Sequence, residues 1–288
     1  MNRSTPEENP QERRPLRAFL FPLRASSFRD WRVLAGAVVV LVLAVFLVRG
    51  LQTRLSYAAL LRSEPDAEAA DPTLAKFAAA QAKPLYAKNC ASCHGADMQG
   101  DTAKGIPNLA DADWLYGSGR VAEIEKTVLY GIRSGDPKAW NLADMPAFGE
   151  AEPYRRYRVQ PLRPQDIRDV IAYIRFVADK PADVEAAKRG AKIFDDTGQC
   201  YDCHANDSRG DSAIGAPNLI DDIWLYGDGS PESVFRSVAH GHAGVCPAWT
   251  RRLKAGQVRA LAVYIHNNAK PAKPVQAVAA TQAQGKPS

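Results

Sequence analysis

The chain has 288 residues, of which 46% are hydrophobic and 24% are charged, and its formal net charge is +5. This length allows about two domains of ordinary size, and the five cysteines, four of them in a repeated motif, exclude a disulfide framework. Residues 1–32 hold seven arginines against four acidic residues, which accounts for +3 of the +5. The rest of the chain is nearly neutral and has no lysine- or arginine-rich run, so we expect no nucleic acid partner.

The N-terminal region predicts one membrane-spanning helix. Residues 33–49 are apolar and uncharged as far as Val48, and this stretch of sixteen residues spans roughly 24 Å as a helix. That is slightly less than the hydrocarbon core, but Trp31 and the flanking arginines can extend the span at the interfaces. A buried core helix would show polar residues at helical spacing, and a signal peptide would end in a small-x-small cleavage site. We therefore expect an uncleaved anchor.

The distribution of arginines predicts the orientation of this anchor. Seven arginines precede it and fewer follow closely, so the positive-inside rule places residues 1–32 in the cytoplasm and the rest of the chain in the periplasm. Residues 50–72 include an acidic, alanine-rich stretch that ends in proline, and we interpret them as a linker. Residues 269–288 are rich in Ala, Pro, Gln and Lys and are expected to form a disordered tail.

One short motif occurs twice, as C-A-S-C-H at residues 90–94 and as C-Y-D-C-H at residues 200–204. C-x-x-C-H is the attachment signature of a c-type haem, in which both thiols bond to the porphyrin and the histidine ligates the iron. A structural zinc site would place its two C-x-x-C halves about 15 to 20 residues apart, whereas more than a hundred residues separate these. We predict two covalently bound haem c groups. The attachment cysteines are Cys90, Cys93, Cys200 and Cys203, and the proximal iron ligands are His94 and His204.

The two motifs belong to a longer internal repeat. The tripeptide P-N-L at residues 107–109 and the tetrapeptide W-L-Y-G at residues 114–117 both recur 110 residues later. The offset then falls to 101, which matches the M-P-A-F of residues 145–148 with the C-P-A-W of residues 246–249. Two copies with so long a period indicate duplicated domains rather than a solenoid. We place the first domain at residues 73–180 and the second at residues 181–268.

Each copy is predicted to be mostly helical, which makes the fold all-α. Apolar residues recur at spacings of three and four before each motif and again at the end of each copy. The expected helices cover residues 73–89, 165–177, 183–194 and 257–266. The helices before the motifs each carry a small residue four positions before an aromatic one, which suits a close crossing against Tyr173 or Tyr264.

The distal side of each iron needs a second ligand from a loop. Met145 is well placed about fifty residues after His94, whereas Met98 follows His94 too closely to reach over the haem. In the second copy the equivalent position is Cys246, so a thiolate is a candidate ligand of the second iron. His242 and His240 precede that position and are the alternatives, and an open coordination site is the third possibility.

Together these motifs resemble the membrane-anchored dihaem cytochrome subunit, subunit III, of cbb3-type cytochrome c oxidases, over roughly residues 75–268. The resemblance implies one transmembrane helix in the bacterial inner membrane, followed by two tandem class I cytochrome c domains in the periplasm. It also implies a non-catalytic subunit that receives electrons from a cytochrome bc complex or a soluble cytochrome c. The electrons would pass to a monohaem cytochrome subunit and the haem–copper catalytic subunit. In that family a loop methionine of one domain can serve the haem of the other, so Met145 is not assigned to one iron.

The chain departs from the family pattern at the second haem. Cys246 replaces the family methionine, and Ala205 follows His204 where glycine is usual. Two other functions therefore stay open at this point. One is the cytochrome subunit of a periplasmic dehydrogenase or another redox complex. The other is a haem sensor or a sulfur-oxidising enzyme that uses Cys246.

Overall fold

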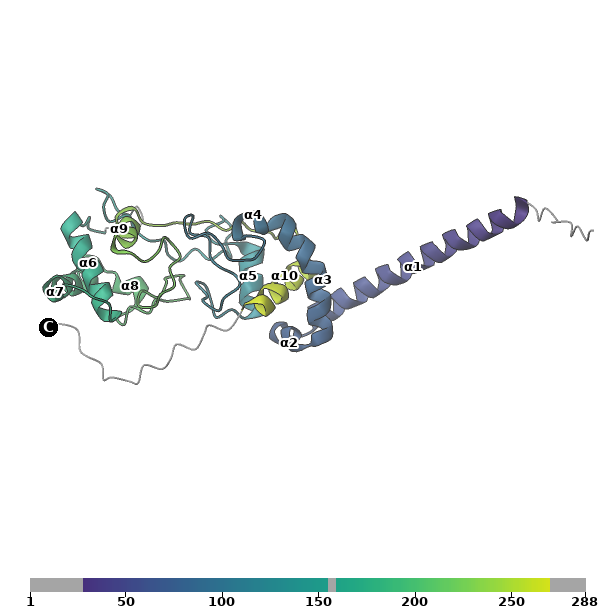
Figure 1. The fold of residues 1–288 in the computed structure, drawn as a ribbon, viewed down its shortest axis with the longest axis horizontal. Coiled ribbons are helices and arrows are strands. Elements are labelled where there is room, and N and C mark those ends of the chain that lie inside the picture. The colour runs from purple at the N-terminus through teal and green to yellow at the C-terminus, as the bar shows by residue number, and fades with distance from the viewer. Residues whose placement is uncertain (1–27, 155–158, 270–288) are drawn as a thin grey trace, which may run out of the picture. The chain divides into compact units, whose positions relative to one another are not determined.

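The computed structural model describes residues 28–154 and 159–269. The chain divides into two compact units, residues 1–53 and residues 54–288. Within the described ranges all regular secondary structure is α-helical, and the only β-structure consists of isolated bridges, which confirms the predicted fold class (Figure 1). Most of the predicted cytoplasmic segment and nearly all of the predicted tail lie outside the described residues.

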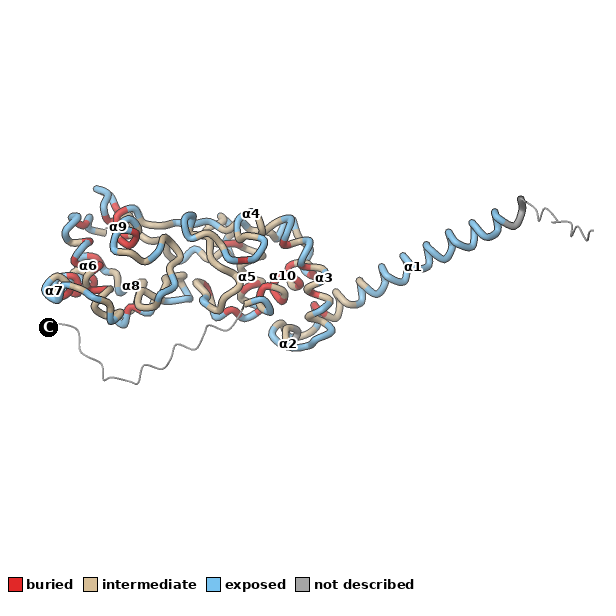
Figure 2. The backbone as a smooth tube through the Cα atoms, in the orientation of Figure 1, coloured by how far each residue is buried: buried red, intermediate tan, exposed pale blue. Residues whose placement is uncertain are grey.

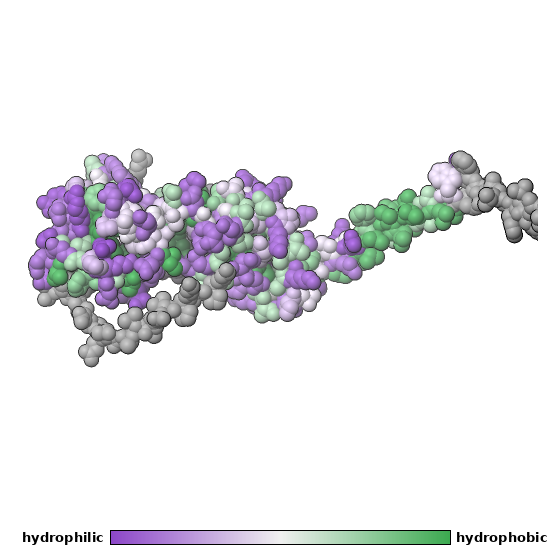
Figure 3. Space-filling view, in the orientation of Figure 1, coloured by the Kyte–Doolittle hydropathy of each residue, from purple (hydrophilic) through white to green (hydrophobic). Residues whose placement is uncertain are grey.

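The first helix, α1 (Phe28–Arg62), is longer than the predicted anchor. Side chains of residues 31–52 are all exposed, and the apolar ones form a continuous stretch along the helix (Figure 3). By length and composition α1 is able to cross a membrane. Its last two turns belong to the second unit, where Leu60 is fully buried and the Tyr57 ring meets Phe77 edge-on at 5.0 Å.

The segment predicted as a linker, residues 50–72, is helical over most of its length. It comprises the end of α1 and a short helix, α2 (Pro65–Ala70). The Asp66 carboxylate accepts a hydrogen bond at 2.8 Å from the backbone N–H of Val121, which satisfies a free donor at the start of a later helix. This segment is therefore part of the packed unit.

The first hydrophobic core combines residues from both ends of the second unit. It contains α3 (Pro72–Asn89), α5 (Val121–Tyr130) and the last helix, α10 (Ala255–Asn268), and it adjoins the single turn α4 (Ala91–His94). Figure 1 shows α10 beside α3 and α5 although more than a hundred residues separate them in sequence. The rings of Tyr86 and Tyr264 meet across this contact at 6.2 Å.

The second core is built from one continuous segment. It contains α6 (Pro164–Val177), α7 (Val184–Asp195) and α9 (Pro231–His240), and it adjoins the single turn α8 (Tyr201–His204). Helices α6 and α7 cross closely at Gly190, where a Cβ atom would stand 1.9 Å from the carbonyl oxygen of Asp169. The rings of Tyr173 and Phe194 lie 5.1 Å apart beside this crossing.

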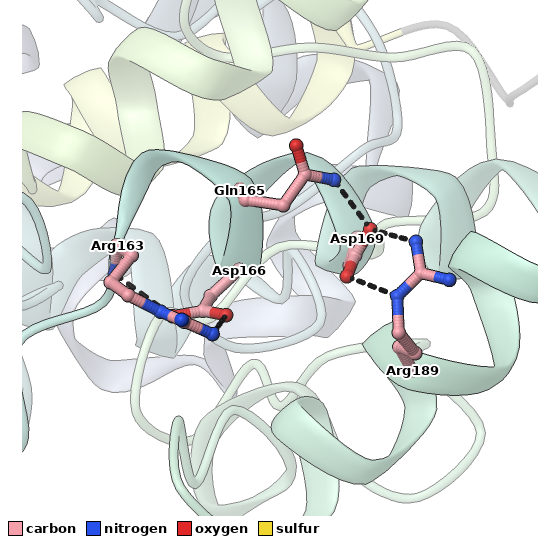
Figure 4. A network of polar contacts seen from close by, with 5 residues as sticks. All are labelled: Arg163, Gln165, Asp166, Asp169 and Arg189. Atoms are coloured by element: carbon pink, nitrogen blue, oxygen red, sulfur yellow. Dashed lines mark hydrogen bonds and ion pairs between the residues drawn. The ribbon is translucent and has the colours of Figure 1, made fainter.

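A buried carboxylate joins α6 to α7 (Figure 4). Asp169 is 3% exposed, and the Arg189 guanidinium donates two hydrogen bonds to it, at 2.7 and 2.8 Å. The Gln165 amide donates a third at 2.9 Å. These hydrogen bonds, with that of Arg189 contributing most, lower the pKa of Asp169 below its ordinary value. The carboxylate is therefore ionised and paired near neutral pH.

The packing groups the helices differently from the predicted domain boundaries. We call residues 54–131 and 245–269 the first half, and residues 144–241 the second half. The buried residues form separate clusters in these halves (Figure 2). The closing helix of each sequence repeat thus packs in the half that holds the other repeat's C-x-x-C-H. A physical reason lies in residues 178–183, since so short a connection makes α6 and α7 adjacent antiparallel helices.

Candidate haem sites

Both C-x-x-C-H motifs fold into a single helical turn that presents the histidine in the same way. The Nδ1 atom of His94 lies 3.1 Å from the carbonyl oxygen of Pro107, and that of His204 lies 3.0 Å from the carbonyl oxygen of Pro217. A carbonyl oxygen only accepts, so each Nδ1 carries the proton and each Nε2 keeps its lone pair. This is the arrangement that orients a metal-ligating histidine. The residues present therefore fit a haem iron at both positions.

Burial also sets the charge of these histidines. It lowers the pKa of both His94 and His204, while the hydrogen bonds to the proline carbonyls act more weakly in the opposite direction. Both imidazoles are consequently neutral near pH 7, and the neutral form is the one that binds a metal.

The residue after each histidine has a backbone conformation that favours glycine. Gly95 has φ +79° and ψ 155°, and its counterpart Ala205 has φ +60° and ψ 166°. Only glycine adopts this region without strain, and other residues there cost on the order of 1–3 kcal/mol. The second motif therefore carries local strain that the first does not.

Each distal segment pairs with the repeat to which it does not belong. Met145 forms an antiparallel bridge with His242, with backbone hydrogen bonds of 2.9 and 3.1 Å. Cys246 forms the equivalent bridge with Ile132, with hydrogen bonds of 2.9 and 3.0 Å. The two segments are thus exchanged between the repeats.

Cys246 lies with the first motif, although its place in the second copy made it a candidate ligand of the second iron. Burial, together with smaller contributions from the nearby Cys246 and Cys93 thiols, raises the pKa of Cys90 to about 11. Burial likewise raises the pKa of Cys246 to about 11, again with a contribution from Cys93. The exchange of distal segments is the physical reason, because Cys246 pairs with Ile132, which directly follows Gly131 at the end of α5.

Met145 lies with the second motif. Its side chain packs against the cluster that α6 and α9 form around Phe148 and Val238. The neighbouring Asp144 is close enough to contribute to the raised pKa of Cys203, although burial is the larger cause. Met98, by contrast, is 3% exposed in the first core, so it belongs to the packing of that half.

The alternative histidine ligands occupy different environments. The side chain of His240 is 69% exposed and lies 3.9 Å from Glu150, so it faces solvent. His242 stacks on the Tyr226 ring, with centroids 3.4 Å apart and planes 8° from parallel. Its Nε2 is buried and has no hydrogen-bond partner among the described residues. Burial and, secondarily, the charge of His240 lower the pKa of His242.

Sequence reasoning recognised W-L-Y-G as a motif but missed what its tyrosines do. Tyr116 covers Gly215 and Tyr226 covers Gly105, so closely that a Cβ on either glycine would stand about 2 Å from the ring. Arg133 also links the two repeats, since its Nη1 donates to the Tyr116 hydroxyl at 2.8 Å and its Nε donates to the carbonyl oxygen of Gly244 at 2.7 Å. The signal was the recurrence of both members of each pair at the same offset of 110. These contacts are reciprocal between the two repeats.

Comparisons with known proteins give two adjoining matches. A family model described as "Cytochrome c" matches residues 79–178, and one described as "Cytochrome C oxidase, cbb3-type, subunit III" matches residues 185–265. They confirm the prediction of two cytochrome c domains and support haem c as the cofactor.

Individual relatives extend over both matches. The cbb3-type cytochrome c oxidase subunit FixP of Azorhizobium caulinodans is 41% identical over 197 residues, which cover 68% of this chain and 61% of that protein. Subunit CcoP of Rhodobacter capsulatus is 36% identical over 216 residues, which cover 72% of this chain and 68% of that protein. The chain spans only 61% to 63% of the length of the FixP relatives from Azorhizobium and Bradyrhizobium.

Proposed function

Because the chain belongs to the family of the cbb3-type cytochrome c oxidase subunit FixP/CcoP, we propose that it is a dihaem electron-transfer subunit of a terminal oxidase. Electrons would come from a cytochrome bc complex or a soluble cytochrome c and leave toward the catalytic core. The observation that carries the proposal is the repeated proximal arrangement, in which His94 and His204 each keep Nε2 free beside two cysteines. A c-type haem supplies a one-electron couple at each of these positions.

The chain's own residues give the two positions unequal distal ligands. We assign the Met145 thioether to the iron that His204 holds, because Met145 packs within the second half. We assign Cys246 to the iron that His94 holds, because its sulfur lies near Cys90 and Cys93. A thioether ligand raises the potential of a haem, whereas a thiolate lowers it. The second half therefore holds the higher potential.

The location and the partners follow from the family to which the chain belongs. Helix α1 would cross the bacterial inner membrane once and carry both halves into the periplasm, where haem attachment takes place. The haem–copper catalytic subunit and the monohaem cytochrome subunit of the oxidase would be the partners. The subunit itself then binds no substrate of its own beyond the electron donor.

Purification of the tagged full-length chain from membranes tests the function. We expect the haem–copper subunit to co-purify, and the complex to reduce oxygen with reduced cytochrome c as donor. Recovery of a quinoprotein dehydrogenase without a haem–copper subunit would support the dehydrogenase alternative instead.

The substitution Cys246→Met tests the ligand assignment in the same preparation. A redox titration should show one haem rising in potential while the haem with the methionine charge-transfer band keeps its value. An unchanged titration would exclude Cys246 as a ligand.

A further inference from the structure

The two distal bridges differ in the residue that faces the proposed ligand. Directly opposite residues of an antiparallel pair place their side chains on the same face, with Cβ atoms about 4.5–5.5 Å apart. Met145 therefore has the imidazole of His242 as its immediate neighbour on that face. Cys246 has the hydrocarbon side chain of Ile132 in the equivalent place. Met145 thus has a second possible metal ligand opposite it, whereas Cys246 has none at the bridge position.

The ring of His242 has a nitrogen atom that no described protein group binds. Its ring is held flat against Tyr226, and its Nε2 is buried without a partner among the residues described. A buried nitrogen without a hydrogen bond has lost its contact with water uncompensated and calls for a functional explanation. Met145 and His242 also line the same open cavity of about 430 Å³.

We propose that His242 is a reserve axial ligand for the iron that His204 holds, and that it takes the distal position when the Met145 thioether is lost. The inference rests on the proposed function only in requiring a haem at the second motif. The imidazole reaches the position by rotating about its side-chain torsions away from Tyr226, since its backbone is already fixed opposite Met145. The bridge of Cys246 offers no such reserve, because the hydrocarbon side chain of Ile132 cannot bind a metal.

Electron paramagnetic resonance of the full-length protein in detergent tests the proposal. In Met145→Ala the methionine charge-transfer band should vanish while both haems stay low-spin, and one of the two midpoint potentials should fall. In Met145→Ala/His242→Ala one of the two haems should become high-spin. A high-spin haem in the single variant, or two low-spin haems in the double variant, would overturn the proposal.

The first half supplies the matched control. Cys246→Ala should turn one haem high-spin, because Ile132 offers no donor. Adding Ile132→His to Cys246→Ala should restore a low-spin haem if the bridge position alone brings an imidazole within reach. If this haem stays high-spin while Met145→Ala behaves as expected, the cavity beside Met145, rather than the bridge position alone, allows the His242 imidazole to approach the iron.

Two further readouts keep the outcomes separate. Covalent haem content is measured in every variant, and Met145→Val, which retains more apolar packing, is read in the same way if Met145→Ala loses haem. The co-purification of a haem–copper subunit with the unchanged protein is independent of all these spectra. If the proposed function fails, the result on the His242 ligand is therefore unaffected. If the wild-type protein has no methionine-ligated haem, the proposed reserve role of His242 is overturned.

Discussion

The two halves of the second unit share a backbone plan but differ at equivalent positions. In the first half Arg259 forms an ion pair with Glu125, with a distance of 2.6 Å between Nε and Oε2. The equivalent Arg168 of the second half stands over the ring of Phe235, 5.5 Å from its centroid. The proximal histidines, by contrast, have the same hydrogen-bond partners in both halves. The proximal geometry is thus the same in the two halves, while the helix contacts differ.

The largest expected effect tests whether the halves are packed as described. Leu261 of α10 is fully buried, and Leu261→Ala should cost about 2–5 kcal/mol of stability. Because α10 packs on α3, the amides of α3 should exchange faster while those of α7 keep their protection. Hydrogen exchange followed by mass spectrometry measures both helices at once. Faster exchange in α7 with α3 unaffected would mean that the halves follow the sequence repeats.

A smaller effect concerns the polar contact that only the second half has. Asp169→Asn removes the charge that Arg189 pairs with and should cost about 2 kcal/mol. The folded pKa of Asp169 is depressed, so its contribution is present above the ordinary value of 3.8 and is lost as pH falls through the folded pKa. The second half should therefore become less stable as the pH falls below about 4, which thermal unfolding followed at the second haem measures.

The variant itself supplies the control for this pH dependence. Asp169→Asn should show a flatter dependence over the same range, because it has no carboxyl to protonate. Equal slopes for the two proteins would assign the acid sensitivity to other groups.

The smallest effect concerns the residue after each haem-binding histidine. Ala205→Gly should stabilise the second half by about 1 kcal/mol, because relief of the strained φ outweighs the added freedom of the unfolded chain. The reverse change, Gly95→Ala, should destabilise the first half, and its Cβ would also stand 2.7 Å from the Asp97 carboxylate. Differential scanning calorimetry of both variants gives the sign of each change in stability. A loss of stability in Ala205→Gly would show that the alanine is not strained.

Four helices of the two halves were predicted because their apolar periodicity is strong, whereas the shorter α5 and α9 were not. Helices α3, α6, α7 and α10 lie within two residues of their expected bounds at every end. Helix α2 was taken as part of a linker, because its acidic and alanine-rich composition resembles one. Its role depends on a long-range contact, the cap that Asp66 provides to Val121, and no local pattern reveals it.

The sequence could not predict which closing helix packs on α3 and which on α7, for a physical reason. Tyr173 of α6 and Tyr264 of α10 occupy equivalent positions, so either helix matches the small and aromatic residues of α3 or α7. The repeat offset shows which residues correspond but says nothing about which copies touch. For the same reason Cys246 could be recognised as the counterpart of Met145, while the C-x-x-C-H motif beside which it lies could not.

The nesting of the second half within the first has a consequence for the order of folding. The chain emerges from the ribosome N-terminus first, so C-x-x-C-H at residues 90–94 appears well before the one at residues 200–204. Residues 144–241 nevertheless form a complete half as soon as they have emerged, whereas α3 and α5 wait for α10 near the C-terminus. The motif that is made first is therefore the last to be enclosed. On the proposed function, its two thiols would stay accessible longest to the machinery that attaches haem.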